Sequence, residues 1–222
     1  MLLLAADTSG KHGSIALARA DSSACVSLEV IPLAGGTFSA QLVPQIAELL
    51  AKHHVSKQDI DGFAVVSGPG SFTGLRVGLA AIKALAEVLQ KPIAAASLLE
   101  AIAFRSIGKV AAVLDAGRGQ VYAGFYEAQE GELPVCVREE LLEVDSFLDS
   151  ARGSTVMTAD GNVAAILRES GIAVQDLDRP QADVIAQIGW RKILRNHTVS
   201  PEDLDANYIR RSDAEIFSKV SS

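Results

Sequence analysis

The order of apolar and polar residues predicts strands at the start of the chain, followed by alternating helices and strands. The first three apolar or alternating runs are closely spaced, which predicts an antiparallel meander: residues 2–6, 15–18 and 25–30. Apolar residues then recur with helical spacing over 39–54 and 75–90, and an apolar strand at 63–66 separates these two predicted helices. A short strand at 92–96 and a short helix at 98–104 end the first half.

The second half begins with the same pattern as the first. An apolar strand ends at Asp7 in the first half, another at 110–114 ends at Asp115, and a glycine-containing turn and a second strand follow each. Further elements are predicted after them: strands at 135–137 and 155–158, and helices at 145–151, 162–169 and 182–195. The repeat predicts an α/β fold of two duplicated lobes of ββαβα type, at 1–105 and 106–222. This plan is similar to the actin, heat-shock-70 and sugar-kinase (ASKHA) superfold, an analogy that establishes no activity by itself.

Composition predicts a globular protein that does not bind a polyanion through its overall charge. Of the 222 residues, 49% are hydrophobic, which is ample for a core, and the formal net charge is −7. Residues 106–222 carry the whole excess, with 12 basic and 19 acidic residues against 8 and 8 in residues 1–105. Any contact with a nucleic acid is therefore expected to be made mainly by a partner.

The N-terminus and the cysteines predict a cytoplasmic protein. Residues 1–6 are apolar, but the run is too short for a signal peptide and lacks its basic flank. No apolar run reaches the length of a membrane span, so no membrane contact is expected. Cys25 and Cys136 have no C-x-x-C spacing and are expected to be buried small apolar residues in a reducing compartment.

The turn before the helix at 75–90 is the most unusual stretch of the chain. Residues 67–74 read SGPGSFTG, so three glycines and a proline force a sharp reversal. Ser71 or Thr73 is expected to cap the helix. A glycine-rich turn that begins a helix presents free N–H groups to an anion, which makes Ser71, Thr73 and the following Arg76 candidates for phosphate binding. A tight structural turn is the competing interpretation, because neither the Walker motif nor the dinucleotide motif matches.

The acidic strand ends are the second candidate for nucleotide chemistry. Asp7 and Asp115 offer carboxylate oxygens, which hard cations prefer, and could bind a metal nucleotide. The alternative, which we favour for metal binding, is that each carboxylate orders its own turn. The four histidines form neither H-x-x-x-H nor H-E-x-x-H, and no hydroxyl has a base nearby in sequence. We therefore predict no metal site and no catalytic residues.

One long run and five shorter segments carry a family resemblance. The run at 68–78 reads GPGSFTGLRVG. The shorter segments accompany it along the chain: ADTS at 6–9, LVPQI at 42–46, LDA and GQVY within 114–122, and YIR at 208–210. Together they span nearly the whole chain and resemble the bacterial TsaB (YeaZ) family, non-catalytic relatives of the TsaD transferase subunit.

The resemblance implies a role in the formation of threonylcarbamoyladenosine (t6A) in tRNA, at the adenosine beside the anticodon. A TsaD-like partner would perform the transfer, a TsaE-like ATPase would bind the pair, and tRNA would meet this chain only indirectly through the complex. The chain itself would require no cofactor, although ATP or ADP could lie at the partner interface. The resemblance also implies that the final segment, about 200–222, packs back on the first lobe.

Family behaviour places the partner contact on the first-lobe helices, here 39–54 and 75–90. The candidate contact residues are Leu42, Ile46, Leu49, Leu79, Ile82 and Lys83. Some of the apolar ones must instead fill the lobe's own core, and the sequence does not divide them.

Two other functions remain open at this stage. The first is an enzyme, either an ATP-dependent small-molecule kinase that uses Asp7 and the turn at 68–74, or a glycoprotease-like peptidase. The lack of histidine pairs and of a paired base counts against both. The second is a homodimeric scaffold that uses the same helices as a self-association face and binds no nucleotide.

Overall fold

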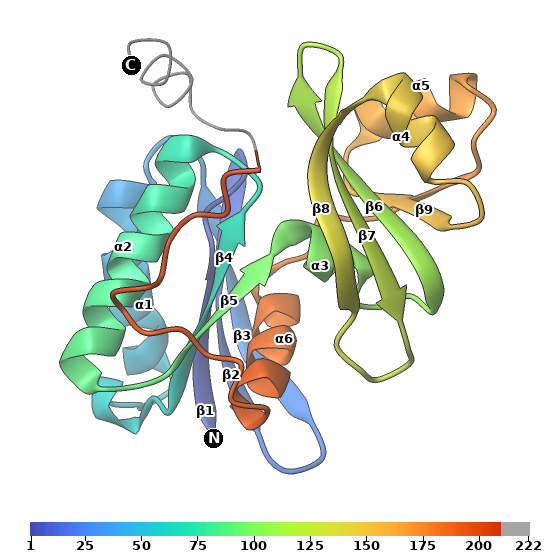
Figure 1. The fold of residues 1–222 in the computed structure, drawn as a ribbon. Coiled ribbons are helices and arrows are strands. Elements are labelled where there is room, and N and C mark those ends of the chain that lie inside the picture. Colours follow the sequence, from blue (N-terminus) through green and yellow to red (C-terminus); the bar gives the residue numbers. More distant parts are fainter. Residues whose placement is uncertain (210–222) are drawn as a thin grey trace, which may run out of the picture.

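Two five-stranded sheets with the same strand order form the framework of the protein (Figure 1). The structure, a computed structural model, describes residues 1–209. The first sheet has the order β3-β2-β1-β4-β5 and the second the order β8-β7-β6-β9-β10. In each sheet the first three strands are antiparallel neighbours, and the last two run parallel to the central strand. The two halves of the chain therefore build the same sheet twice.

Helices and strands also follow one another in the same order in both halves. The strands of the first sheet are β1 (Leu2–Asp7), β2 (His12–Ala20), β3 (Cys25–Ala34), β4 (Gly62–Gly68) and β5 (Ile93–Ser97), with a 3-10 turn η1 (Lys57–Asp59) before β4. Those of the second are β6 (Gly108–Gly117), β7 (Gln120–Ala128), β8 (Val135–Glu143), β9 (Thr155–Thr158) and β10 (Val174–Asp176). The helices are α1 (Phe38–Lys52), α2 (Phe72–Leu89), α3 (Leu98–Ala103), α4 (Val144–Ser150), α5 (Gly161–Glu169) and α6 (Ala182–Leu194).

Each half has the element order βββαβαβα, which confirms the predicted duplication. The repeated unit is longer than the predicted one. The predicted ββαβα unit lacks two strands and one helix of the observed one. β10 was not predicted, because it has only three residues and two of them are exposed.

The central strands are buried on both faces. β1 is LLLAAD and all six of its residues are buried, since β2 and β4 flank it and helices pack on it. Such a strand reads as a continuous apolar run. The edge strands β3 and β8 keep exposed residues instead. Cys25 on β3 is half-buried and Cys136 on β8 is exposed, so the prediction that both are buried is wrong for Cys136.

The last helix of each half packs on the sheet of the other half. α3 lies mainly against β6 and β7 of the second sheet, while α6 lies against all five strands of the first. Figure 1 shows α6 on the face of the first sheet that points toward the second lobe, with α1 and α2 on the opposite face. Gly189 permits this packing, because a Cβ there would lie 2.4 Å from Ala64 Cβ. No helix of the part of the chain that the structure describes has both the length and the hydrophobicity of a membrane span.

The position of α6 corrects the predicted second lobe, 106–222. We expected the chain to return to the first lobe only at about residue 200, but it has returned by Ala182, where α6 begins. The buried side chains of α6, among them Ile185 and Ile188, fill the core of the first lobe. The described part of the final segment continues along the same lobe, and Val199 bridges to Ile93 of β5. Residues 210–222 lie outside the described part of the chain.

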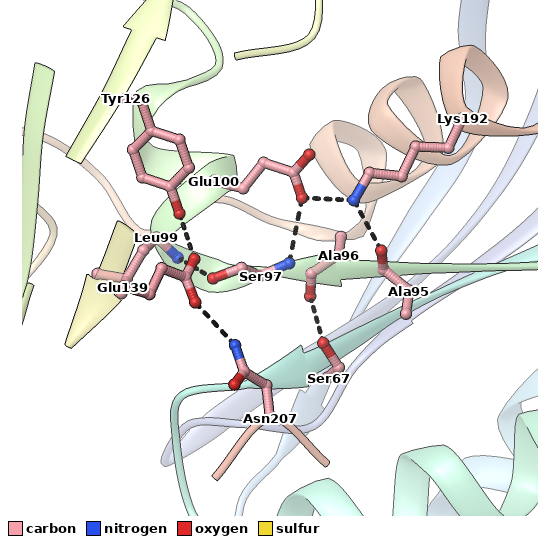
Figure 2. A network of polar contacts seen from close by, with 10 residues as sticks. All are labelled: Ser67, Ala95, Ala96, Ser97, Leu99, Glu100, Tyr126, Glu139, Lys192 and Asn207. Atoms are coloured by element: carbon pink, nitrogen blue, oxygen red, sulfur yellow. Dashed lines mark hydrogen bonds and ion pairs between the residues drawn. The ribbon is translucent and has the colours of Figure 1, made fainter. Parts of the chain in front are cut away.

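A buried ion pair holds α6 against the start of α3 at the junction of the lobes (Figure 2). Lys192 Nζ lies 2.7 Å from Glu100 Oε2 and donates a 2.8 Å hydrogen bond to the carbonyl of Ala95. Glu100 Oε2 also accepts from the backbone N–H of Ser97, which caps α3. Burial raises the pKa of Glu100, and Lys192 opposes that shift. Loss of Lys192 would leave the buried Glu100 carboxylate without its cation, so the pair fixes α6 at this junction.

Glu29 joins the edge strand β3 to the end of α1. Its Oε1 accepts a 2.5 Å hydrogen bond from Lys52 Nζ, and its Oε2 lies 2.8 Å from His53 Nε2. These contacts lower the pKa of Glu29 below its ordinary value of 4.5. A carboxyl group with a lowered folded-state pKa stabilises the fold above its unfolded-state pKa, and this contribution is lost as the pH falls through the folded-state value.

We therefore predict that Glu29→Gln lowers the melting temperature at neutral pH, and that the gap to the unmodified protein closes below about pH 4.5. Circular-dichroism melts over a range of pH measure both effects. Glu48→Gln is the control, because Glu48 is exposed and its carboxylate accepts from Gln45 within α1. A gap that is independent of pH would contradict this role of Glu29.

Candidate functional site

The turn between β4 and α2 packs against the turn between β1 and β2. The Ser71 N–H donates a 2.7 Å hydrogen bond to the Ser9 carbonyl, and Thr8 Oγ1 donates one of 2.7 Å to the Gly74 carbonyl. A Cβ on Gly74 would lie 2.1 Å from the Thr8 carbonyl oxygen, and one on Gly78 would lie 2.3 Å from Thr8 Oγ1. Only glycine permits so close an approach. At these positions the glycine-rich run therefore meets the backbone and the side chain of Thr8, which supports the structural interpretation of the turn.

Ser71 is the residue that begins α2. Its Oγ accepts a 3.3 Å hydrogen bond from the Gly74 N–H, so the predicted cap is confirmed for Ser71. Thr73 lies within the first turn of the helix and is not the N-cap.

A cleft of about 410 Å³ opens between the lobes, where the turns that follow the equivalent strands β1 and β6 meet. Residues 9–11 and 115–117 both line it, together with Ser71 at the start of α2. Lys11, Asp115, Asp160 and Arg179 give the lining two cationic and two anionic side chains. The structure thus brings together two of the predicted nucleotide candidates, Ser71 and Asp115.

Asp7 is buried beneath this cleft and does not line it. Its Oδ1 accepts from the Ser9 N–H at 2.7 Å and from the Ser9 hydroxyl, and its Oδ2 lies 3.5 Å from Arg179 Nη2. The same guanidinium nitrogen donates a 2.7 Å hydrogen bond to Ser9 Oγ. Both carboxylate oxygens are therefore engaged by the protein. Arg179 was not among the predicted site residues. It lies in a polar stretch that matches no motif, and only the fold brings it close to Asp7.

Asp115 is exposed at the end of β6 and orders its own turn. Its Oδ1 accepts a 2.8 Å hydrogen bond from the Gly117 N–H, which is the turn role that the sequence offered as the alternative to metal binding. Within residues 1–209, no cluster of three or more His, Cys, Asp or Glu side chains is arranged to hold a metal ion.

Burial raises the pKa of the Cys25 thiol to about 11, so this thiol is uncharged at neutral pH.

The other two nucleotide candidates lie away from the cleft. Thr73 lines a separate pocket of about 240 Å³ between the starts of α1 and α2. The Arg76 guanidinium lies 3.7 Å from the centre of the Phe72 ring, and its Nε donates to the Tyr208 hydroxyl at 3.3 Å. The structure therefore does not bring Ser71, Thr73, Arg76 and Asp115 together in one nucleotide site.

The predicted partner-contact residues lie mostly in the core. Five of them are buried, with side chains at most 7% exposed: Leu42, Ile46, Leu49, Leu79 and Ile82. The prediction is wrong for these five, because the apolar stripe of each helix faces the first sheet and the other helix. Lys83 is half-buried, and its Nζ donates to the Glu202 carbonyl at 3.3 Å.

A second stripe on each helix is apolar and exposed. On α1 it consists of small or short side chains at helical spacing: Ala40, Val43, Pro44, Ala47 and Ala51. On α2 it recurs every fourth residue, with Arg76 the one charged member: Phe72, Arg76, Ala80, Ala84 and Val88. Val43 is 58% exposed and Val88 is 76% exposed. Because α1 and α2 pack side by side on the face of the sheet away from α6, we call these two stripes together the outer face.

Comparison with known proteins assigns the chain to a family. The sequence model described as "TsaD: tRNA N6-adenosine threonylcarbamoyltransferase" matches residues 30–175. A Bacillus subtilis (strain 168) protein named tRNA threonylcarbamoyladenosine biosynthesis protein TsaB is 36% identical over 207 residues, which cover 92% of this chain and 85% of that protein. This chain belongs to the TsaB family. The TsaB protein of Escherichia coli (strain K12) is 27% identical over 227 residues, 96% of either chain.

A solved structure shares the fold. YeaZ from Pseudomonas aeruginosa superposes with a TM-score of 0.77 and 26% sequence identity, over 93% of this chain and 99% of that one. The predicted family and the predicted duplicated two-lobed fold are thus confirmed over nearly the whole described chain.

The contact between the two turns yields a first prediction for this site. Gly74→Ala would place a Cβ against the Thr8 backbone, which must shift, so we expect a loss of about 1–3 kcal/mol in the free energy of unfolding. Urea denaturation measures the loss. Gly161→Ala is the matched control, because a Cβ at Gly161 meets nothing within 4 Å. Equal stability of the two variants would contradict the close-packing role.

The Asp7–Arg179 contact yields a second prediction for this site. Arg179→Ala would leave a buried carboxylate without its cation, so we expect a loss of about 1–3 kcal/mol in the free energy of unfolding. Arg168→Ala is the control, since both side chains of its pair with Asp176 are about half exposed, whereas Asp7 is buried. We expect it to change stability by less than about 1 kcal/mol. An Arg179 variant as stable as the Arg168 variant would show that Asp7 does not depend on Arg179.

Proposed function

We propose that this chain is a non-catalytic subunit of the assembly that makes t6A in tRNA, and that it acts by binding a TsaD-like catalytic subunit through the outer face of α1 and α2. The observation that carries the proposal is the outer face itself. It offers an apolar surface on two packed helices, of the kind that the core of a protein interface requires. Its alanines let a partner helix approach closely.

The geometry of the cleft supports a role without catalysis. An actin-like catalytic centre would need free carboxylates at the strand ends, but Asp7 is held by Ser9 and Arg179, and Asp115 orders its own turn. These contacts also count against a kinase that uses Asp7. We propose that a nucleotide, where the assembly requires one, lies at the partner interface and that this chain needs no cofactor of its own.

The family match supports a TsaD-like partner. The TsaD sequence model covers residues 30–175, which include both α1 and α2. Two related chains that share these helices can pair like on like around an approximate two-fold axis, as in isologous dimers. The same face would let this chain pair with itself when the partner is absent. A homodimer is therefore a competing use of the outer face rather than a separate function.

We infer that the remaining components meet the chain as parts of the complex. A TsaE-like ATPase would bind the pair, and tRNA would be held mainly by the partner, since the net charge of −7 disfavours direct binding of a polyanion. Arg210 and Arg211, two cationic residues near the end of the chain, lie outside the described residues. An assembly that modifies tRNA also favours the cytoplasm as its location.

The outer face gives the sharpest prediction. Ala47→Arg places a charge at the centre of the proposed interface, and burying it unpaired costs several kcal/mol, so we expect at least about a hundredfold weaker binding of the TsaD-like subunit. The t6A content of tRNA in the reconstituted reaction, measured by mass spectrometry, should fall with it. The melting temperature should stay nearly unchanged, because Ala47 is exposed.

Ile166→Arg is the matched control, since Ile166 is an exposed apolar residue on α5 of the second lobe. It should bind the partner like the unmodified chain. If Ala47→Arg binds equally well, the proposed interface is wrong. If the isolated chain turns over ATP or a peptide, the non-catalytic role is wrong.

A further inference from the structure

The segment after α6 crosses the first lobe and ends between the two lobes. We call residues 196–209 the strap. The Val199 N–H donates a 2.9 Å hydrogen bond to the Ile93 carbonyl at the edge of β5, and the Glu202 carbonyl accepts from Lys83 of α2. Leu204 is buried in the core of the first lobe. The strap is therefore fixed to the first lobe along its length.

Asn207 connects the strap to both lobes. Its backbone N–H donates a 2.8 Å hydrogen bond to the Ser67 carbonyl at the end of β4, in the first lobe. Its side-chain Nδ2 donates a 2.7 Å hydrogen bond to Glu139 Oε2 on β8, in the second lobe (Figure 2). The strap also packs closely at Gly68, where a Cβ would lie 2.7 Å from the Asn207 carbonyl oxygen.

The acceptor in the second lobe is held in place. The other oxygen of Glu139 accepts a hydrogen bond from the hydroxyl of Tyr126, a residue of β7 that is 2% exposed. Burial raises the pKa of Tyr126, so its hydroxyl remains a donor. Glu139 is thus a fixed, charged acceptor, and the hydrogen bond from Asn207 is of the stronger, charge-assisted kind. We call this hydrogen bond the latch.

The next residue of the strap packs against the outer face. The Tyr208 ring lies 5.4 Å from the Phe72 ring, centre to centre, and its hydroxyl accepts from Arg76. Phe72 is 44% exposed and Arg76 is exposed, and both are members of the α2 stripe of the outer face. Two adjacent residues of one segment therefore contact the second lobe and the outer face.

We propose that the strap couples occupation of the outer face to closure of the two lobes. The inference rests on the proposed function, because it assumes that a TsaD-like partner covers Phe72 and Tyr208. In the closed state Tyr208 packs on Phe72 and Asn207 forms the latch with Glu139. In the open state the latch is broken and the lobes turn apart about the α3–α6 junction, where the Glu100–Lys192 pair stays in place. A partner that holds Tyr208 in place favours the closed state, and by linkage the latch strengthens partner binding by the same factor.

The test measures both ends of this coupling in the full chain. Spin labels at Lys57→Cys and Glu169→Cys, exposed sites in the first and second lobes, report the interlobe distance when Cys25 and Cys136 are replaced by serine. Asn207→Ala should broaden the distance distribution toward longer values. It should also weaken binding of the TsaD-like subunit by roughly fivefold or more, although Asn207 is not a member of the outer face.

Two further variants separate the latch from general damage to the fold. Glu139→Ala breaks the latch from the second lobe and should have the same effect as Asn207→Ala, and the double variant should add little to either. Glu140→Ala is the matched control on the same strand, because its carboxylate pairs with Arg138 and not with the strap. It should leave both the distance and the affinity unchanged.

The outcomes distinguish failure of the coupling from failure of the proposed function. If the unmodified chain binds the partner but Asn207→Ala and Glu139→Ala match it in distance and affinity, the coupling is overturned while the proposed function stands. If the unmodified chain does not bind the partner, both the proposed function and the coupling are overturned. In that case the distance distributions still report whether the latch holds the lobes.

Discussion

The contact between the turn after β1 and the start of α2 is the constraint on which the rest of the first lobe depends. Thr8 lies so close to α2 that a side chain at Gly74 or Gly78 would collide with it, and Ser9 lies equally close to Gly70 in the turn before the helix. This contact fixes the height and direction of α2 on the sheet. It therefore also fixes α1, which packs beside α2, and the strap, which packs on α2 from outside. The outer face, the cleft and the latch all take their positions from it.

The same contact separates the two surfaces that a duplicated α/β protein of this kind can use. On the cleft side, the turn after β1 is occupied by protein groups, since Asp7 is bound by Ser9 and Arg179. On the other side, α2 and α1 present small apolar side chains that are exposed in the described part of the chain. Chemistry is thus disfavoured in the cleft and association is favoured on the helices. A subunit that supports a related catalytic chain needs this combination.

The sequence predicted most of the elements and the duplication, because central strands are continuous apolar runs and helices carry a periodic apolar stripe. It could not predict which sheet a helix would cover. The stripe of α6 fits either sheet, and only the fold shows that α3 and α6 exchange lobes. The same limit explains the error over the partner contacts: Leu42 and Ile46 stand out in the sequence because they form the core, whereas Ala47 carries no signal.

The site residues divide in the same way. Ser71 was predictable as a cap, because capping is a local interaction of a hydroxyl with the next turn. Arg179 and Asn207 were not predictable from the sequence. Arg179 contacts Asp7, and Asn207 contacts Glu139, across a long separation in sequence. The glycine-rich run was recognisable as a family signature, but the physical reason for its glycines is the close approach of Thr8, Ser9 and Asn207, which no local pattern reveals.

The most direct test of the account is site-specific photo-crosslinking in the reconstituted assembly. A photoreactive amino acid at Ala80, in the α2 stripe of the outer face, should crosslink to the TsaD-like subunit. The same amino acid at Ile166, exposed on the second lobe, should not. That result would locate the partner on the two helices, as the account predicts. Crosslinks from Ile166 but none from Ala80 would contradict it, because the chain would then bind its partner through a different surface.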